Sequence, residues 1–374
     1  MRKAGILLPI TSLPSDYGIG CFSKEAYEFA DFLSESGQTL WQILPLGHTG
    51  YGDSPYQAFS AFAGNPYMID LCTLKDEGLL TDEELKSAPQ KENTGKVNYS
   101  EQYEKRYPLL RKAYERSNFK ENENYKRFYR ENEYWLSDYS LFMAIKQNFG
   151  GRMWLEWPDD IKYGKSKEEY AKRLEREVDF WNFVQFKFWE EWNSLKVYCN
   201  SKGIEIIGDI PIYVSMDSSD VWANPHLFEL NDDLSPRFVA GCPPDGFSPQ
   251  GQLWGNPIYK WGNHIKHGFQ WWIQRIKHTL TLCDILRIDH FRGFESYYSI
   301  PASSQNAIGG NWEKAPGREL FDTVKTALPH ATIIAEDLGF ITNEEDARNM
   351  LTDNWRQKMA DAIAAGIINS LLKY

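Results

Sequence analysis

The segment Cys283-Asp284-Ile285-Leu286-Arg287-Ile288-Asp289-His290 decides the fold class of this chain. It is a short apolar run that ends on a carboxylate, and Thr332-Ile333-Ile334-Ala335-Glu336-Asp337 repeats that pattern further along. Both runs have the length and composition of buried parallel strands. A charged side chain at the end of a buried strand costs free energy unless it is paired with an opposite charge or has a functional role. Because the catalytic residues of a β/α barrel collect at the carboxyl ends of its strands, the two runs predict a functional pair of carboxylates.

Runs of strand type and helical patterns alternate along the rest of the chain. The runs of strand type are Gly5–Pro9, Leu40–Leu46, Ile204–Val214, Asp284–Asp289 and Thr332–Leu338. Apolar residues at helical spacing predict helices over Glu25–Ser36 and Phe180–Cys199, which Gly37 and Gly203 would end. Alternating strands and helices favour a parallel sheet. We therefore predict an α/β fold of the TIM-type (β/α)8 barrel class.

Two features of the chain depart from a regular barrel. Residues 74–170 are rich in charge and tyrosine without an evident strand, which predicts a helical insertion after the second strand. Only five runs of strand type can be counted, whereas a closed barrel has eight, and residues 340–374 are mostly polar and helical. We therefore expect one barrel domain over residues 1–350, incomplete at its C-terminal end, and a C-terminal helical segment over residues 351–374.

Composition argues against several classes of function. The formal net charge of −11 disfavours nucleic-acid and anionic-membrane partners, which bind basic patches. No apolar run reaches the ~18 residues of a transmembrane helix, and the apolar stretch near the N-terminus is too short for a signal peptide. Five scattered cysteines without a CxxC pair indicate reduced thiols in a cytoplasm, and the seven histidines lack metal-ligand spacing. We expect a cytoplasmic protein without bound metal, in which an aromatic content of 15% suits either sugar binding or a large core.

Six short motifs, in a fixed order, carry a resemblance to a known family. They are Thr11-Ser12-Leu13-Pro14, Trp41-Gln42-Ile43-Leu44-Pro45-Leu46-Gly47, Gly50-Tyr51-Gly52-Asp53-Ser54-Pro55-Tyr56-Gln57, Gly208-Asp209-Ile210-Pro211-Ile212-Tyr213-Val214, Asp220-Val221-Trp222-Ala223-Asn224-Pro225 and Gly251-Gln252-Leu253-Trp254-Gly255-Asn256-Pro257. From about residue 4 to about residue 345 the chain resembles glycoside hydrolase family 77, the 4-alpha-glucanotransferases or amylomaltases. The resemblance implies transfer of α-1,4-glucan segments from a maltooligosaccharide or amylose donor to the 4-hydroxyl of a glucose or glucan acceptor. It also implies a retaining double displacement that needs no cofactor.

The resemblance assigns the first strand-end carboxylate to nucleophilic catalysis. Asp289 matches the family's nucleophile, and Arg287 points to the same side because positions i and i+2 of a strand share a face. A cation at that spacing lowers the pKa of a carboxylate and keeps it ionised for attack. The alternative is an Arg–Asp pair that only holds two strands together.

The second strand-end carboxylate, Glu336, matches the family's general acid/base. That residue protonates the leaving oxygen and then deprotonates the incoming hydroxyl. Its role needs a raised pKa, to which the apolar run Ile333–Ala335 would contribute by desolvation. A retaining mechanism holds the two carboxyl groups about 5–5.5 Å apart. The alternative, a carboxylate that caps a strand–helix junction, better suits the neighbouring Asp337.

The resemblance places further residues in the substrate site. Asp209, at the end of the segment Ile204–Asp209, would be an inward-facing acid that binds substrate hydroxyls and orders the site, and His290 follows the nucleophile. A lone histidine is often structural, so a sugar-binding and a structural interpretation of His290 both stay open. A loop that contains glycine and proline carries Tyr51, Ser54 and Tyr56. This loop either lines the glucan groove or is a tight turn packed on its own tyrosines.

Gly241–Gly255 resembles the loop that forms the family's lid over the acceptor side. A lid that excludes water while admitting a sugar hydroxyl favours transfer over hydrolysis. The residues that match the pattern are Asp245, Phe247, Gln252 and Trp254. The family usually carries an aromatic residue where this chain has Gly246, so a stacking face is lost and backbone freedom is gained.

One element of the family pattern has no match in this chain. The family's third catalytic carboxylate lies in a His-Asp motif past the acid/base, and no such motif follows Glu336. Asn354–Met359 and Ala360–Tyr374 resemble the family's C-terminus, which favours an internal loss between about residues 347 and 353. Without a third acid, the oxocarbenium-like transition state lacks an electrostatic partner.

Two alternatives to an active transferase therefore stay open. One is a catalytically impaired glucan-binding remnant or a truncated fragment of such an enzyme. The other is a hydrolase of the α-amylase type, which fits less well because the lid and the motifs between Trp41 and Tyr56 point to transferases.

Overall fold

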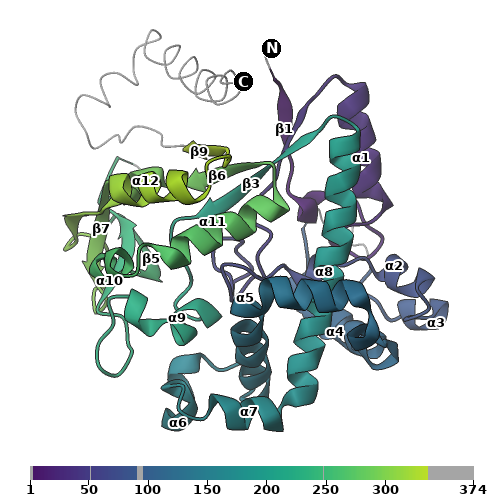
Figure 1. The fold of residues 1–374 in the computed structure, drawn as a ribbon, viewed down its shortest axis with the longest axis horizontal. Coiled ribbons are helices and arrows are strands. Elements are labelled where there is room, and N and C mark those ends of the chain that lie inside the picture. The colour runs from purple at the N-terminus through teal and green to yellow at the C-terminus, as the bar shows by residue number, and fades with distance from the viewer. Residues whose placement is uncertain (1–2, 51, 91–95, 247, 336–374) are drawn as a thin grey trace. The chain divides into compact units, whose positions relative to one another are not determined.

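A computed structural model of the chain describes residues 3–50, 52–90, 96–246 and 248–335 (Figure 1). These residues form two compact units, and each is described by itself. The N-terminal unit contains residues 4–206 and 217–223, and the C-terminal unit contains residues 207–216 and those from 224 onward. The expected segment 351–374 lies outside the described residues, and the last expected strand is described up to Ala335.

The N-terminal unit begins with two parallel strands joined by a helix. Strands β1 (Gly5–Leu7) and β2 (Leu40–Gln42) pair in parallel with Gly5 opposite Leu40, and α1 (Lys24–Glu35) connects them. Gly37 follows the end of α1 with a φ of +72°, a conformation that favours glycine. Gly5 is required by the pairing, because a Cβ there would lie 2.3 Å from the Leu40 carbonyl oxygen. This βαβ unit lies where the sequence predicts it.

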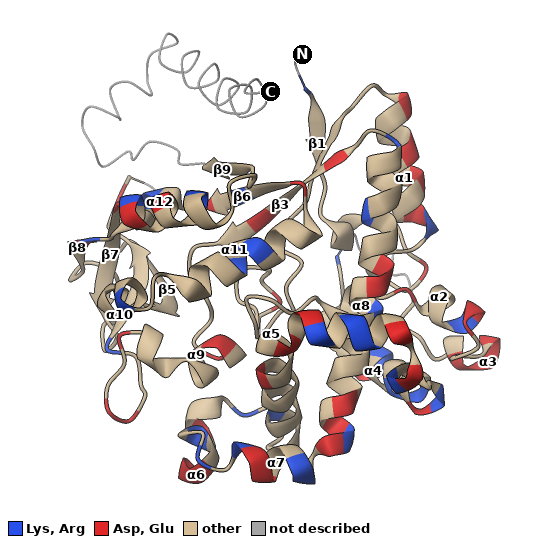
Figure 2. Cartoon of the chain, in the orientation of Figure 1, with Lys and Arg blue, Asp and Glu red and all other residues tan. Residues whose placement is uncertain are grey.

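Helices occupy most of the N-terminal unit after β2. They are α2 (Leu71–Asp76), α3 (Asp82–Leu85), α4 (Tyr99–Arg116), α5 (Glu123–Asn148), α6 (Asp159–Lys162), α7 (Lys167–Arg173), α8 (Glu175–Ser201) and α9 (Ser219–Ala223). Many of the largest buried side chains lie on α5 and α8, among them Phe142 and Phe183. Acidic and basic residues are mixed along the helices (Figure 2), as in the ion pair of Arg116 with Glu84. The predicted helical insertion after the second strand is confirmed.

Three parallel strands lead to the strand-end carboxylates. They are β3 (Glu205–Pro211), whose first two residues belong to the N-terminal unit, β6 (Ile285–Asp289) and β9 (Ile333–Ala335). Strand β6 pairs with both others, with Asp209 opposite Arg287 and Ile288 opposite Ala335. Helix α11 (Gln270–Leu282) leads into β6, and α12 (Gly317–Ala327) leads into β9. The α/β class with a parallel sheet is therefore confirmed.

The C-terminal unit also holds an antiparallel sheet that the sequence did not predict. Its strands, in the order β5-β4-β7-β8, are β4 (Phe238–Cys242), β5 (Gln252–Pro257), β7 (Ser296–Pro301) and β8 (Asn311–Lys314). Helix α10 (Trp261–Lys266) follows β5. The stretch Gly241–Gly255, expected to be one loop, is a hairpin that contains the end of β4, a connection and most of β5. The described helices include none long and apolar enough to cross a membrane.

Candidate active site

Arg287 lies between two carboxylates at the carboxyl ends of β3 and β6. Its Nη1 donates to Oδ1 of Asp209 at 2.8 Å, and its Nη2 donates to Oδ1 of Asp289 at 2.8 Å. The strand register sets Asp209 opposite Arg287, and Asp289 lies two positions further along the strand of the arginine. Side chains at these positions share one face of the sheet. The backbone of two strands thus brings all three groups together.

The two carboxylates differ in their exposure. The side chain of Asp209 is 1% exposed, that of Arg287 is 16% exposed, and that of Asp289 is 40% exposed. A buried carboxylate needs its guanidinium partner, because an unpaired buried charge costs about 3–5 kcal/mol. Asp289, in contrast, is open to a bound molecule. The group therefore consists of one acid that is held in place and one acid that is available for chemistry.

His290 follows Asp289 in a left-handed backbone conformation, with a φ of +51°. Histidine is among the residues that tolerate this region. Its ring contacts Trp254 edge to face, with the ring centroids 5.1 Å apart. Burial lowers the pKa of His290 below its ordinary value, against the opposing effect of Asp289, and Arg292 lowers it further. The ring is therefore mainly neutral at pH 7 and offers one hydrogen-bond donor and one acceptor.

The connection between β4 and β5 is held by hydrogen bonds of its own. Oδ1 of Asp245 accepts from the Ser248 amide at 2.6 Å, and the Ser248 hydroxyl donates to the Gly251 carbonyl at 2.7 Å. Gly251 has a φ of +67°, and a Cβ there would lie 2.4 Å from a carbonyl oxygen of β4. On β5, Nε1 of Trp254 donates to Oε1 of Gln252 at 3.0 Å. The hairpin thus has a defined conformation in the residues that the structure describes.

The structure brings several predicted site residues together within the C-terminal unit. Asp209, Arg287 and Asp289 form one bonded group, and His290 contacts Trp254. Three predicted residues, Tyr51, Phe247 and Glu336, lie outside the described residues. Strand β9 ends on the residue before Glu336, at Ala335, and Ala335 pairs with Ile288, the residue before Asp289.

The remaining predicted residues belong to a loop of the N-terminal unit. Ser54 and Tyr56 are half-buried, and the Ser54 hydroxyl oxygen accepts from the Tyr56 amide at 3.3 Å. The ends of the loop are joined where the Gly50 amide donates to the Gln57 carbonyl at 2.7 Å. Tyr51 lies outside the described residues. The loop is therefore a closed hairpin-like segment rather than an open strand connection.

The structure also shows a buried arginine near the strand ends that was not predicted from the sequence. Arg275 of α11 donates to the Pro211 carbonyl at 2.7 Å and to the Ile212 carbonyl at 3.0 Å. The hydroxyl of Tyr259 also donates to the Ile212 carbonyl, at 2.8 Å. These bonds hold the chain directly after Asp209. The available signal was that Arg275 lies at helical spacing from Trp271 and Trp272, on the apolar face of the helix.

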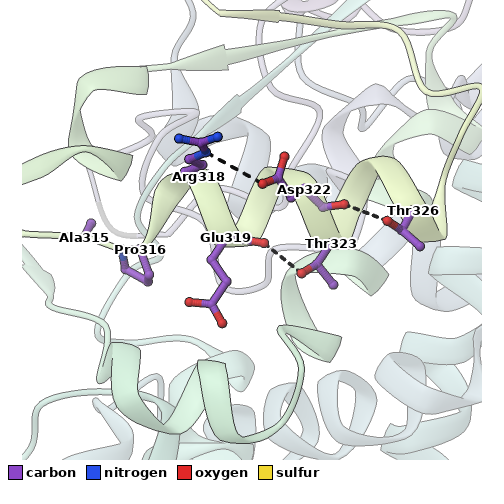
Figure 3. A pocket seen from close by; sticks show the side chains of 7 residues that line it. All are labelled: Ala315, Pro316, Arg318, Glu319, Asp322, Thr323 and Thr326. Carbon is purple, nitrogen blue, oxygen red and sulfur yellow. Dashed lines mark hydrogen bonds and ion pairs between the residues drawn. The ribbon is translucent and has the colours of Figure 1, made fainter.

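A surface hollow in the C-terminal unit lies along α12 and not at the strand ends (Figure 3). The residues that line it are Ala315, Pro316, Arg318, Glu319, Asp322, Thr323 and Thr326. Arg318 pairs with Asp322 at 3.9 Å, and both threonine hydroxyls donate to carbonyls one helical turn earlier. These groups satisfy one another and converge on no common point. In the part of the chain that the structure describes, no three His, Cys, Asp or Glu side chains gather as metal ligands.

Comparison with known proteins gives extensive matches. A family model described as 4-alpha-glucanotransferase matches residues 8–353. A 4-alpha-glucanotransferase from Clostridium butyricum is 51% identical over 338 residues, which cover 90% of this chain and 69% of that protein. One from Streptococcus pneumoniae is 48% identical over 347 residues, 92% of this chain and 69% of that protein.

Solved structures match over a similar span. The amylomaltase from Streptococcus agalactiae in complex with acarbose has a TM-score of 0.87 at 45% identity, and the match covers 93% of this chain and 71% of that chain. The amylomaltase from Corynebacterium glutamicum, at 20% identity and a TM-score of 0.72, shares the fold.

Proposed function

This chain belongs to the 4-alpha-glucanotransferase family, glycoside hydrolase family 77, and we propose on that premise that it moves α-1,4-glucan segments from a maltooligosaccharide or amylose donor to the 4-hydroxyl of a glucose or glucan acceptor. The family and the enzyme class predicted from the sequence are confirmed by the match over residues 8–353 and by the relative at 51% identity. The TIM-type barrel fold is confirmed by the amylomaltase with a TM-score of 0.87.

The observation that carries the proposal is the bonded group of Asp209, Arg287 and Asp289. Asp289 is the acid of this group that a sugar can reach, since 40% of its side chain is exposed. Arg287 holds one of its oxygens at 2.8 Å and so orients the carboxylate toward a bound anomeric carbon. Asp289 is the proposed nucleophile. Asp209, at 1% exposure, orders the site through its bond to Arg287.

The proposed reaction is a double displacement. A carboxylate oxygen of Asp289 bonds to the anomeric carbon as the glycosidic bond breaks, and Glu336 gives its proton to the leaving 4-oxygen. The acceptor 4-hydroxyl then attacks the same carbon, gives its proton to Glu336 and releases Asp289. The β6–β9 register supports this pairing, because the residues before the two acids, Ile288 and Ala335, lie opposite each other. Glu336 makes both proton transfers and Asp289 makes and releases the covalent bond, so no cofactor enters the scheme.

Further residues are proposed to bind the glucan. The neutral ring of His290 suits hydrogen bonding to sugar hydroxyls, and the Trp254 ring beside it suits contact with a pyranose face. The hairpin that carries Asp245, Phe247 and Gln252 is the proposed lid on the acceptor side. Tyr51, Ser54 and Tyr56 are proposed to bind the donor.

The domain boundaries and the location in the cell also remain proposals. Residues 1–350 are assigned to the catalytic barrel with the insertion at 74–170, and residues 351–374 to a C-terminal helical segment. All five cysteines are free, which supports a reducing cytoplasm. The net charge of −11 supports glucan rather than nucleic acid or membrane as the partner.

Purified protein and maltotriose test the proposed activity. We expect the wild-type chain to release glucose and to form longer maltooligosaccharides, resolved by chromatography. Asp289→Asn should lower this rate by about 10³-fold or more, because the nucleophile is lost. Asp284→Asn, a matched change directly before the same strand, should stay near the wild-type rate. A wild-type rate no higher than that of Asp289→Asn would contradict the proposal.

The second candidate is a glucan-binding remnant without turnover. The reason to test it is that residues 337–374 contain no His-Asp motif. A thermal melt with and without maltooligosaccharide separates the possibilities. A midpoint raised by the sugar, without any turnover, would support the remnant, and absence of a cooperative transition would support a truncated fragment.

A further inference from the structure

A buried histidine outside the proposed reaction is bonded to the helical insertion through both ring nitrogens. His48 lies in the N-terminal unit, directly before the loop that carries Ser54 and Tyr56, and is 3% exposed. Its Nδ1 lies 2.7 Å from the hydroxyl of Tyr139 on α5, and its Nε2 lies 2.9 Å from the hydroxyl of Tyr107 on α4. One side chain therefore connects the start of the loop to two helices distant in sequence.

The backbone of His48 closes the base of the same loop. Its amide donates to the Ala63 carbonyl at 3.1 Å, and its carbonyl accepts from the Phe59 amide at 2.8 Å. The next pair inward joins the Gly50 amide to the Gln57 carbonyl at 2.7 Å. The residues between His48 and Phe59 are called here the 49–58 loop. At the base of this loop, His48 makes hydrogen bonds through both its backbone and its side chain.

The two side-chain bonds are consistent with a neutral ring that gives one proton and accepts one. The Tyr139 hydroxyl accepts from Nε2 of Gln185 at 3.3 Å, which leaves its own proton for Nδ1 of His48. In that tautomer, Nε2–H of His48 is the donor to the Tyr107 hydroxyl. Burial lowers the pKa of His48 to about 3, and the positive charge of Lys146 acts in the same direction. The ring therefore keeps this arrangement throughout the neutral pH range.

We infer that His48 is a positioning residue for donor binding: it fixes the 49–58 loop to α4 and α5, so that Ser54 and Tyr56 are already ordered when a glucan arrives. The inference rests on the proposed binding role of these two residues. A loop that is ordered in the free protein loses less conformational entropy on binding, so the complex is tighter. The helical insertion thereby contributes to donor binding, because its Tyr107 and Tyr139 hydroxyls hold the loop.

Three variants of the full chain test the inference. Tyr107→Phe removes one hydroxyl and leaves the packing of the ring, and His48→Gln removes the ring. The matched control is His264→Gln on α10, since His264 is also buried, at 1% exposure, and its Nε2 lies 3.1 Å from the Leu227 carbonyl oxygen. The control loses a buried histidine in the C-terminal unit and leaves the hydrogen bonds of the 49–58 loop intact.

Hydrogen exchange and steady-state kinetics are the two readouts. We expect the Gly50 and Phe59 amides to exchange roughly fivefold to tenfold faster in Tyr107→Phe and His48→Gln, and to be unchanged in His264→Gln. The KM for a maltooligosaccharide donor should rise by about three- to tenfold in the first two variants, with kcat within about twofold of wild type. Thermal midpoints should fall in all three, so that lost stability alone does not produce the pattern.

The possible outcomes separate the inference from the proposed function. Unchanged exchange in Tyr107→Phe and His48→Gln would overturn the inference, because His48 would then only fill the core. Faster exchange with an unchanged KM would also overturn it, because the loop would be anchored without serving the donor. A wild-type chain that neither transfers nor binds maltooligosaccharide would instead refute the proposed function, while faster exchange in the variants would still support the anchoring.

Discussion

Arg287 joins a buried and an exposed carboxylate, and its two bonds have different consequences at the residue scale. The bond to Asp209 balances a charge that is 1% exposed, so it contributes to the free energy of unfolding. The bond to Asp289 orients an acid that is 40% exposed and open to substrate. A single side chain therefore couples the stability of the sheet to the geometry of the proposed nucleophile.

Replacement of this arginine should destabilise the protein as well as inactivate it. We expect Arg287→Met to lower the free energy of unfolding by about 3–5 kcal/mol, because the buried charge of Asp209 loses the guanidinium that neutralises it. Denaturant titration measures this loss. In an Asp209→Asn background the same change should cost less than half as much, since no buried charge is left. Equal costs in the two backgrounds would show that the ion pair is not the cause.

The sequence predicts only part of this residue-level arrangement. The approach of Arg287 to Asp289 follows from strand alternation, because residues two apart share a face. The bond from Arg287 to Asp209 joins residues 78 positions apart and depends on the register between β3 and β6, which no local pattern contains. The bonds of His48 to Tyr107 and Tyr139 are also non-local, and they depend on how α4 and α5 pack. Local sequence patterns therefore identify candidate site residues, whereas strand register and helix packing determine which of these residues contact one another.

At the scale of elements, the parallel strands were predictable and the antiparallel sheet was not. Buried parallel strands are mainly apolar, as in Ile285–Asp289, where the three apolar residues are the buried ones, and helices with an apolar face separate such strands. Strands β4 and β5 contain glycine and polar residues, and their pairing joins residues across a connection. Strand preference depends strongly on such neighbours. Gly241–Gly255 therefore looked like a loop although much of it is a hairpin.

Close contact between β3 and Cys283, two residues before β6, favours glycine at position 208. A Cβ on Gly208 would lie 2.8 Å from both Cβ and Sγ of Cys283, which follows α11. We expect Gly208→Ala to lower the free energy of unfolding by about 1–3 kcal/mol, because the added methyl group overpacks the core. Denaturant titration should show much of this loss restored by Cys283→Gly in the same chain.

Gly262 of α10 is the matched control for that change, because a Cβ there has nothing within 4 Å. Gly262→Ala should leave stability unchanged or raise it slightly, since alanine favours helix. A loss in Gly262→Ala as large as that in Gly208→Ala would contradict the steric explanation. So would a Cys283→Gly change that restores nothing.

At the scale of the whole molecule, each of the two units buries a neutral histidine. Burial lowers the pKa of His48 to about 3 and that of His264 to about 4. The pKa of a histidine in an unfolded chain is about 6.5. Between these values the unfolded chain binds protons that the folded chain does not bind. The free energy of unfolding therefore falls as the pH falls from about 6.5 toward 4, and above pH 7 neither histidine makes it depend on pH.

We therefore expect each histidine to remove about 2 kcal/mol from the free energy of unfolding between pH 7 and pH 5. Denaturant titrations of wild type, His48→Gln and His264→Gln at both pH values isolate the two contributions. Both variants should be less stable than wild type at pH 7, because buried hydrogen bonds are lost. On acidification, however, each should lose about 2 kcal/mol less than the wild type, because the replaced histidine no longer takes up a proton on unfolding. A variant that loses as much as the wild type would show that its histidine binds a proton in the folded chain as readily as in the unfolded one, and that the hydrogen-bonded ring is not held neutral by burial.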